Sequence, residues 1–188
     1  MSGIYAMNIL SGSNEYIIPL FNDNINKLSS HFRRDERWHL DNAEEIISLD
    51  ENGGLRISDV IFHKDLLLFS NPLKAFLDKQ GIDYIFYKKV VVSDEVIGIE
   101  EKFWLASVPR IDCIDFERTV IENRDDYDHS FGIVPFYDID NPVIVPSQCG
   151  RYKMFRILGS VSEMVYCTED LANKLKAENF DGIDFTEI

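Results

Sequence analysis

The most constraining feature of this sequence is a strand–helix–strand pattern in residues 164–185. Residues 164–167 form a short apolar run, and Thr168 follows at once with two carboxylates behind it. A hydroxyl followed by carboxylates is typical of a helix start, because the side-chain oxygen accepts an unpaired backbone N–H and negative charge favours that end of the helix dipole. Three apolar residues then share one helical face: Leu171, Ala172 and Leu175. Gly182 ends the helix, and residues 183–185 continue as a strand.

A similar pattern occurs earlier, at residues 69–84. Ser70 and Pro72 predict a second helix start, since proline near the first helical position loses little by lacking an N–H. The Gly-Ile-Asp that begins at Gly81 matches the Gly-Ile-Asp that begins at Gly182. An internal duplication and the ordinary capping rules would both produce this similarity, and the sequence leaves both explanations open.

Further apolar runs predict additional strands, at residues 82–87, 89–92, 103–108 and 154–158. Residues 4–10 and 16–20 indicate weak strands or extended segments, residues 57–62 alternate in part, and residues 66–69 form a compact apolar run. We therefore predict an α+β fold, in which short helices and two similar strand–helix–strand units accompany a mixed or mostly antiparallel sheet. With 188 residues and 45% apolar content, the chain is large enough to bury its own core. We predict one domain over residues 1–188, with a divergent N-terminal lobe at 1–65 and the remainder at 66–188.

The charge of the chain is strongly acidic, with 33 Asp and Glu against 19 Lys and Arg and a formal charge of −14. This balance argues against direct nucleic-acid binding, which relies on Lys and Arg to displace counterions from phosphates. It permits a basic protein partner, because opposite charge steers association, although many cytosolic proteins are acidic for solubility alone.

No segment has the roughly 18 apolar residues that a membrane span needs, and the first residues lack the pattern of a signal peptide. The cysteines are odd in number and lie beside apolar residues: Cys113, Cys149 and Cys167. They are typical of buried thiols in a reducing compartment. We expect a cytoplasmic protein that does not associate with a membrane.

The common catalytic and cofactor motifs are absent from the sequence. The four histidines show no metal-ligand spacing, and no Cys-x-x-Cys, P-loop or dinucleotide-binding fingerprint occurs. We therefore predict no metal, no cofactor and no enzymatic activity. The alternative is a small cytosolic enzyme or nucleotide-binding protein, which would use either Cys113 as a nucleophile or the basic and aromatic patch from Arg33 to Trp38.

A long region without periodicity, residues 122–150, concentrates acidic residues. Loops of this length are usually functional or mobile. A solvated loop, a recognition surface for a basic protein, and a catalytic or metal site are all compatible with this composition. For a recognition surface, the candidate residues are the acids and two amphipathic anchors of the kind enriched at binding hot spots: Glu122, Asp125, Asp126, Tyr127, Asp128, Tyr137, Asp138 and Asp140.

Several motifs together resemble the bacterial immunity proteins of polymorphic toxin systems, in particular the immunity protein 11 family, also called domain of unknown function 1629. The strongest are Ile-Asp-Cys-Ile-Asp at residues 111–115 and the Gly-Ile-Asp-Phe ending at residues 182–185. The segments around Trp104 and Phe155-Arg156 add to the similarity. The resemblance covers residues 66–188.

This resemblance implies a non-enzymatic antitoxin, made in the cytoplasm, that binds and neutralises a cognate secreted or contact-delivered toxin. The family supplies no catalytic residue to transfer, and its binding surface varies with the toxin. The acidic region identified above is therefore our candidate toxin-binding surface, and a basic toxin is the expected partner.

Overall fold

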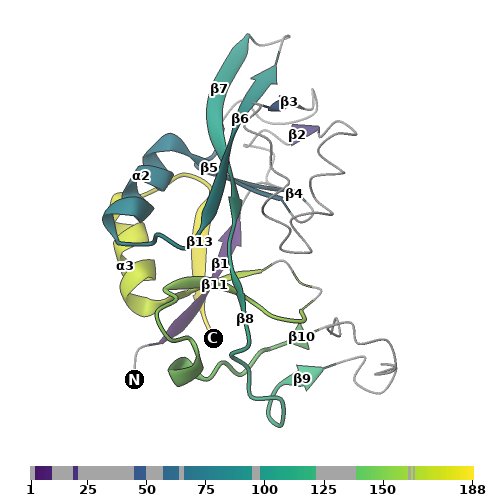
Figure 1. Ribbon diagram of the computed structural model, residues 1–188, viewed down its shortest axis with the longest axis vertical. Coiled ribbons are helices and arrows are strands. Elements are labelled where there is room, and N and C mark those ends of the chain that lie inside the picture. Colours follow the sequence, from purple (N-terminus) through teal and green to yellow (C-terminus); the bar gives the residue numbers. More distant parts are fainter. Residues whose placement is uncertain are drawn as a thin grey trace. The chain divides into compact units, whose positions relative to one another are not determined.

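The computed structural model describes residues 3–9, 19–20, 45–49, 57–63, 66–94, 98–121, 139–160, 162 and 164–188 (Figure 1). Short helices accompany strands that pair mostly in antiparallel fashion, so the α+β fold expected from the sequence is confirmed. Within these ranges, no helix is long and apolar enough to cross a membrane.

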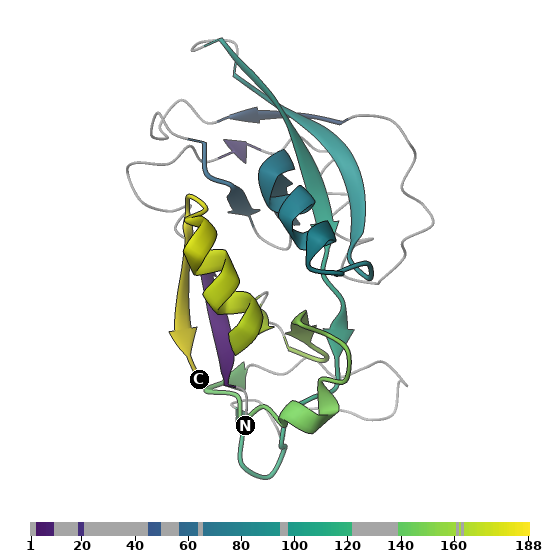
Figure 2. The same cartoon turned by 90° about the vertical axis from the view of Figure 1, so that its left-hand side faces the viewer.

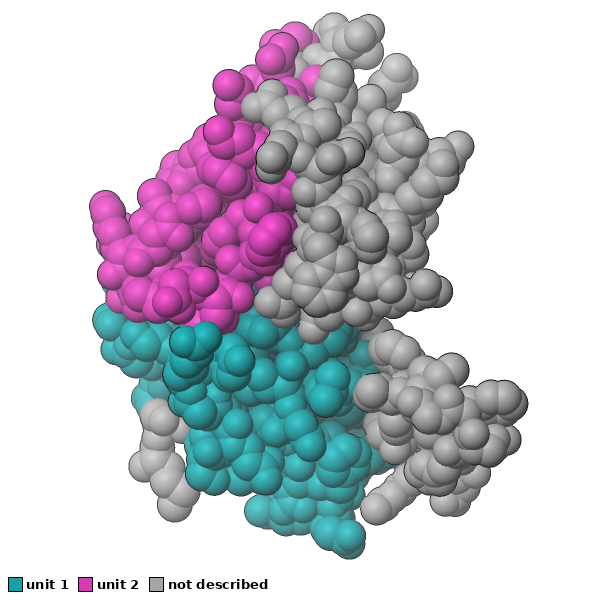
Figure 3. Space-filling model, viewed as in Figure 1, with its two compact units in different colours: residues 1–8, 108–177, 185–188 teal, residues 9–107, 178–184 magenta. Residues whose placement is uncertain are grey.

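The chain divides into two compact units (Figure 3). Unit 1 contains residues 1–8, 108–177 and 185–188, and unit 2 contains residues 9–107 and 178–184. Each unit therefore combines segments that are distant in the sequence. The division into an N-terminal lobe at residues 1–65 and a second portion at 66–188 stays a prediction.

Unit 2 is built on a sheet with the strand order β2-β3-β6-β7-β5-β4. Its strands are β2 (Pro19–Leu20), β3 (Glu45–Leu49), β4 (Val60–His63), β5 (Leu66–Ser70), β6 (Phe86–Asp94) and β7 (Ile99–Ser107). β6 and β7 form a long antiparallel hairpin, in which Phe86 lies opposite Ser107 at one end and Asp94 opposite Ile99 at the other. β3 pairs with β6 in parallel, and the other neighbouring strands are antiparallel.

The helix of unit 2, α2 (Asn71–Lys79), begins where β5 ends because Ser70 caps it. The Ser70 Oγ accepts the backbone N–H of Leu73 at 3.2 Å, as the sequence predicts. After the helix, Gly81 adopts a φ of 72°, which reverses the chain with little strain for glycine. Figure 2 shows α2 alongside β6 and β7, and its apolar face is buried.

The strand predicted at residues 82–87 is wrong over most of its length, because β6 begins only at Phe86. Ile82 and Ile85 are buried, yet they lie in the connection that leads from α2 back to the sheet. Their apolar character therefore reflects core packing rather than strand pairing. Residues 57–62, which alternate only in part, belong to a strand from Val60 onward.

Unit 1 is built on a sheet with the order β13-β1-β12-β11-β8. Its strands are β1 (Ile4–Ile9), β8 (Arg110–Ile111), β11 (Met154–Ile157), β12 (Val165–Thr168) and β13 (Ile183–Glu187). The helix α3 (Glu169–Glu178) follows β12 directly, and the three residues predicted to share its apolar face are all buried: Leu171, Ala172 and Leu175. A one-turn 3-10 helix, η3 (Pro146–Gln148), and a two-stranded ribbon complete the described part of this unit.

The two strand–helix–strand segments have the same connectivity. α2 connects β5 to β6, which have β7 between them in the sheet, and α3 connects β12 to β13, which have β1 between them. Figure 2 shows α3 alongside β1 and β13, and the Lys176 Nζ lies 4.8 Å from the centroid of the Tyr5 ring on β1. Each helix thus covers one face of its own sheet.

Candidate functional site

Most of the acidic residues predicted to bind the toxin lie outside the described residues: Glu122, Asp125, Asp126, Tyr127, Asp128, Tyr137 and Asp138. Asp140 is the exception, because its backbone belongs to β10 (Ile139–Asp140). The patch from Arg33 to Trp38 also lies outside the described residues. The structure therefore shows where the acidic segment is attached to the fold.

Both ends of the acidic segment are held in one short ribbon. β9 (Val120–Ile121) pairs with β10 in antiparallel fashion, with Ile121 opposite Ile139 and Val120 opposite Asp140. Six acids and one arginine give residues 122–140 a formal charge of −5, with His129 neutral. The residues on either side of the acidic segment are thus paired neighbours in unit 1.

A hydrogen-bonded turn at residues 115–118 precedes this ribbon in the chain. The Asp115 carboxylate accepts the backbone N–H groups of Glu117 at 3.0 Å and Arg118 at 3.3 Å. Asp115 also donates its own N–H to the carbonyl of Val143 at 2.8 Å, and the Val143 N–H donates to the Thr119 Oγ1 at 3.0 Å. Asp115 precedes the acidic segment in the sequence, and its carboxylate stabilises a turn.

The cysteine nucleophile of the alternative enzyme hypothesis is buried. Cys113 is 0% exposed, and burial together with the neighbouring Cys149 raises its pKa from 9.0 to about 12. A thiol with such a pKa is protonated near neutral pH and is a poor nucleophile. The described residues also contain no group of three or more His, Cys, Asp or Glu side chains that could hold a metal ion. The part of the chain that the structure describes therefore offers no support for cysteine or metal chemistry.

A cleft of about 510 Å³ opens in unit 1 next to the ribbon. Its lining comes from β1, β10 and the turn after it, the residues around β12, and the end of β13: Ala6, Ile139, Asn141, Pro142, Ser162, Met164, Tyr166, Thr186, Glu187 and Ile188. Ile139 immediately follows the acidic residues in the sequence and lies at the cleft. The cleft and the attachment point of the acidic segment therefore form one continuous region, which is our candidate interaction site.

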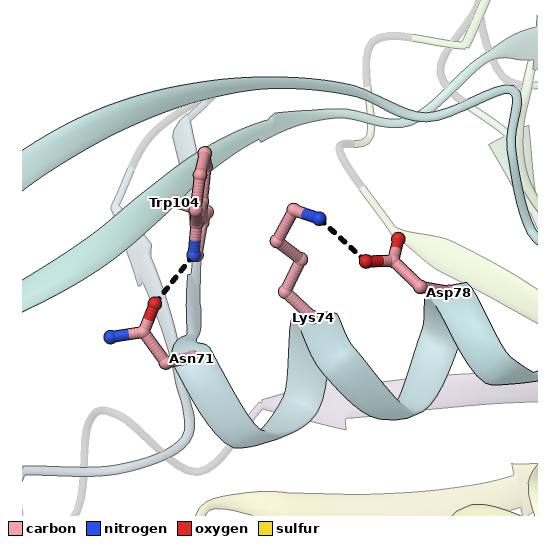
Figure 4. A network of polar contacts seen from close by, with 4 residues as sticks. All are labelled: Asn71, Lys74, Asp78 and Trp104. Atoms are coloured by element: carbon pink, nitrogen blue, oxygen red, sulfur yellow. Dashed lines mark hydrogen bonds and ion pairs between the residues drawn. The ribbon is translucent and has the colours of Figure 1, made fainter.

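Trp104 in unit 2 belongs to a network of polar contacts that stabilises the fold (Figure 4). The Trp104 Nε1 donates to the Asn71 Oδ1 at 2.7 Å, and the Asn71 Nδ2 donates to the carbonyl of Lys102 at 3.1 Å. The Lys74 Nζ lies 4.9 Å from the indole centroid and 2.6 Å from the Asp78 carboxylate. These contacts hold the first turns of α2 against β7.

Comparison with known proteins identifies the family to which this chain belongs. Residues 30–188 match the Immunity protein family (Imm11). The chain is a member of the Imm11 immunity protein family. A search of curated proteins found no match.

Membership in Imm11 confirms the resemblance seen in the sequence, and the match begins at residue 30, upstream of the residue 66 at which that resemblance starts. It gives the chain a role in toxin immunity and implies a non-enzymatic function with a toxin as partner. Sequence reasoning missed the cleft of this Imm11 protein, because the lining residues come from four separate segments and share no motif.

Proposed function

We propose that this Imm11 protein binds a cognate toxin in the cytoplasm through the acidic segment at residues 122–140 and masks a basic surface at the toxin's active site. The observation that supports the proposal most is the concentration of charge, −5 over 19 residues, on a segment whose two ends are fixed by the β9–β10 ribbon. An acidic segment with fixed ends is suited to meet a basic surface, because complementary charge accelerates and orients association.

The bound toxin would be inhibited by occlusion. Toxins that act on nucleic acids or phosphorylated substrates commonly have basic active sites, since Lys and Arg bind phosphate. A carboxylate-rich loop can occupy such a site in place of the substrate without any chemistry of its own. This agrees with the absence of nucleotide-binding and catalytic motifs from the sequence.

The first experiment co-expresses the chain with the polypeptide encoded by the neighbouring gene. We expect the two proteins to co-purify and the chain to restore growth of cells that produce that polypeptide. If the chain neither binds it nor relieves its toxicity, the proposed function is wrong.

The second experiment tests the acidic segment. We expect Asp125→Asn, Asp126→Asn and Asp128→Asn in combination to lower the association rate about tenfold at low salt, with a smaller difference at high salt, because the lost interaction is electrostatic. Association rates are measured by biolayer interferometry from 25 to 500 mM NaCl. The matched control removes three exposed acids of unit 2 by Asp83→Asn, Glu100→Gln and Glu101→Gln. If the association rate falls by the same factor in both triple variants, only the net charge of the protein matters and the acidic segment is not the contact surface.

A further inference from the structure

The cleft beside β10 has an apolar floor that is part of the core of unit 1. Ala6 on β1 lies directly opposite Tyr166 on β12, so the two side chains are neighbours on one face of the sheet. Both belong to a buried cluster with Ile139 and Phe155, and Met164 packs against this cluster while it lines the cleft. The floor is therefore fixed by core packing and does not need to form when a partner binds.

The one acidic side chain among the lining residues that the structure describes points to the other face of the sheet. Glu187 shares a hydrogen bond with Tyr5. Tyr5 and Ala6 are consecutive in β1, so their side chains lie on opposite faces. The other side chains that line the cleft in the described part of the chain are apolar or uncharged, and they include Met164, Tyr166 and Thr186. Because a charge costs free energy when it is buried without a partner, such a surface favours an apolar side chain.

Acidic residues flank one lining residue of the cleft in the sequence. Ile139 lines the cleft, and Asp138 and Asp140 precede and follow it in the sequence. A partner side chain that enters the cleft is thus close to Ile139 in β10, where a segment with a formal charge of −5 joins the described part of unit 1. Basic residues next to the inserted side chain would be attracted by this charge.

We propose that the cleft binds an aromatic or long aliphatic side chain of the toxin, carried on a segment in which Lys or Arg flanks that side chain. This inference rests on the proposed function and adds the anchor that the acidic segment alone does not provide. The charged segment steers the encounter, and the inserted side chain slows dissociation, as buried anchors do in protein interfaces. A cleft of about 510 Å³ lies within the size range of pockets that bind ligands in proteins.

The test replaces Met164 with Glu and measures binding to the purified polypeptide encoded by the neighbouring gene. We expect the dissociation constant to rise about tenfold or more, mainly through a faster dissociation rate, because the new carboxylate is buried against an apolar side chain. The sign is diagnostic, since an added acid strengthens attraction to a basic toxin at any position where only charge matters. Met164→Leu, which keeps an apolar side chain of similar volume, is expected to bind within about threefold of the unchanged protein.

The matched control is Leu158→Glu. Leu158 is a 40% exposed apolar residue of unit 1 that does not line the cleft, and the substitution adds the same charge. We expect this variant to bind at least as tightly as the unchanged protein. Circular dichroism and thermal unfolding establish that each variant is folded before binding is compared.

A second measurement requires no substitution. Met7 and Met154 are buried, whereas Met164 is partly exposed at the cleft, so methyl-¹³C methionine spectra contain an internal reference. We expect addition of the same polypeptide to shift the Met164 methyl resonance and to leave those of Met7 and Met154 nearly unchanged.

If the folded Met164→Glu variant binds as tightly as the unchanged protein, or if the Met164 resonance does not respond, the inference is overturned while the proposed function stands. Equal losses of affinity for Met164→Glu and Leu158→Glu would overturn it as well. If the unchanged protein does not bind the polypeptide at all, the proposed function fails and the inference fails with it.

Discussion

Gly182 is the position at which a single added methyl group is expected to be most costly. Its φ is 78°, in the left-handed region, and it is buried between α3 and β13. A Cβ built at this position overlaps the Cβ of Ser58 and lies 3.0 Å from its Oγ. The substitution Gly182→Ala therefore combines backbone strain with a steric overlap in unit 2.

Gly81 separates these two costs. Its φ is 72°, close to that of Gly182, but a Cβ built there has nothing within 4 Å. Left-handed backbone costs a residue with a Cβ about 1–2 kcal/mol, and overpacking of a buried site adds about 1–3 kcal/mol. We expect Gly81→Ala to lower the free energy of unfolding by about 1–2 kcal/mol and Gly182→Ala to lower it by about 2–5 kcal/mol.

The assay is urea denaturation at pH 7 and 25 °C, followed by far-UV circular dichroism. A thermal scan should show a midpoint about 2–4 °C lower for each kcal/mol lost in a chain of this size. The reasoning also predicts a rescue, because Ser58→Gly removes the atoms that the new Cβ overlaps. In the Ser58→Gly background, Gly182→Ala should cost no more than Gly81→Ala does in the original chain. Equal losses for Gly81→Ala and Gly182→Ala in the original chain would show that the overlap is relieved without cost.

Two further predictions concern the partly buried Asp59 carboxylate and the buried Cys113 thiol. Asp59→Ala should lower the free energy of unfolding by about 1–3 kcal/mol, because the carboxylate accepts hydrogen bonds from the Ser70 hydroxyl and the Asp181 N–H. Urea denaturation measures the loss, and a value below about 0.5 kcal/mol would show that these hydrogen bonds do not stabilise the fold. For Cys113, burial raises the pKa from 9.0 to about 12. Above pH 9 the unfolded chain therefore loses the thiol proton while the folded chain retains it. The free energy of unfolding should fall as the pH rises from 9 towards 12. Urea titrations at pH 7, 9 and 10.5 measure the slope, which should become smaller in Cys113→Ala; an unchanged slope would assign it to other groups.

The helices could be predicted from the sequence because local rules determine them. Ser70 caps α2, and the residues with helical spacing from Leu171 to Leu175 are the buried ones of α3. The start of β6 could not be predicted, because Ile82 and Ile85 are apolar for burial beneath the connection and not for pairing in a sheet. Apolar pattern alone does not distinguish these two causes.

The candidate site was predictable only in part. Composition identified the acidic segment, but β9 and β10 have two residues each and are too short to give a strand pattern. Their pairing is nevertheless what brings residues 121 and 139 together. The cleft was beyond sequence reasoning, because its floor depends on the register that sets Ala6 opposite Tyr166, residues that are far apart in the chain.

The common connectivity of the two strand–helix–strand segments does not require an internal duplication. A helix with its side chains is about 10 Å wide, and neighbouring strands are about 4.8 Å apart, so a helix that lies on a sheet covers two strand spacings. The strands before and after it then have one strand between them, as β5 and β6 have β7 and as β12 and β13 have β1.

In unit 1 this packing has a consequence for binding. Because α3 covers the face of β1 that bears Tyr5, the cleft beside Ala6 opens on the opposite face. The helix packs on one side of the sheet, and Cys113, Ile114 and Cys149 pack with Ala6 in the core on the other. The cleft that Ala6, Ile139 and Tyr166 line is the part of that second side that we propose for the partner.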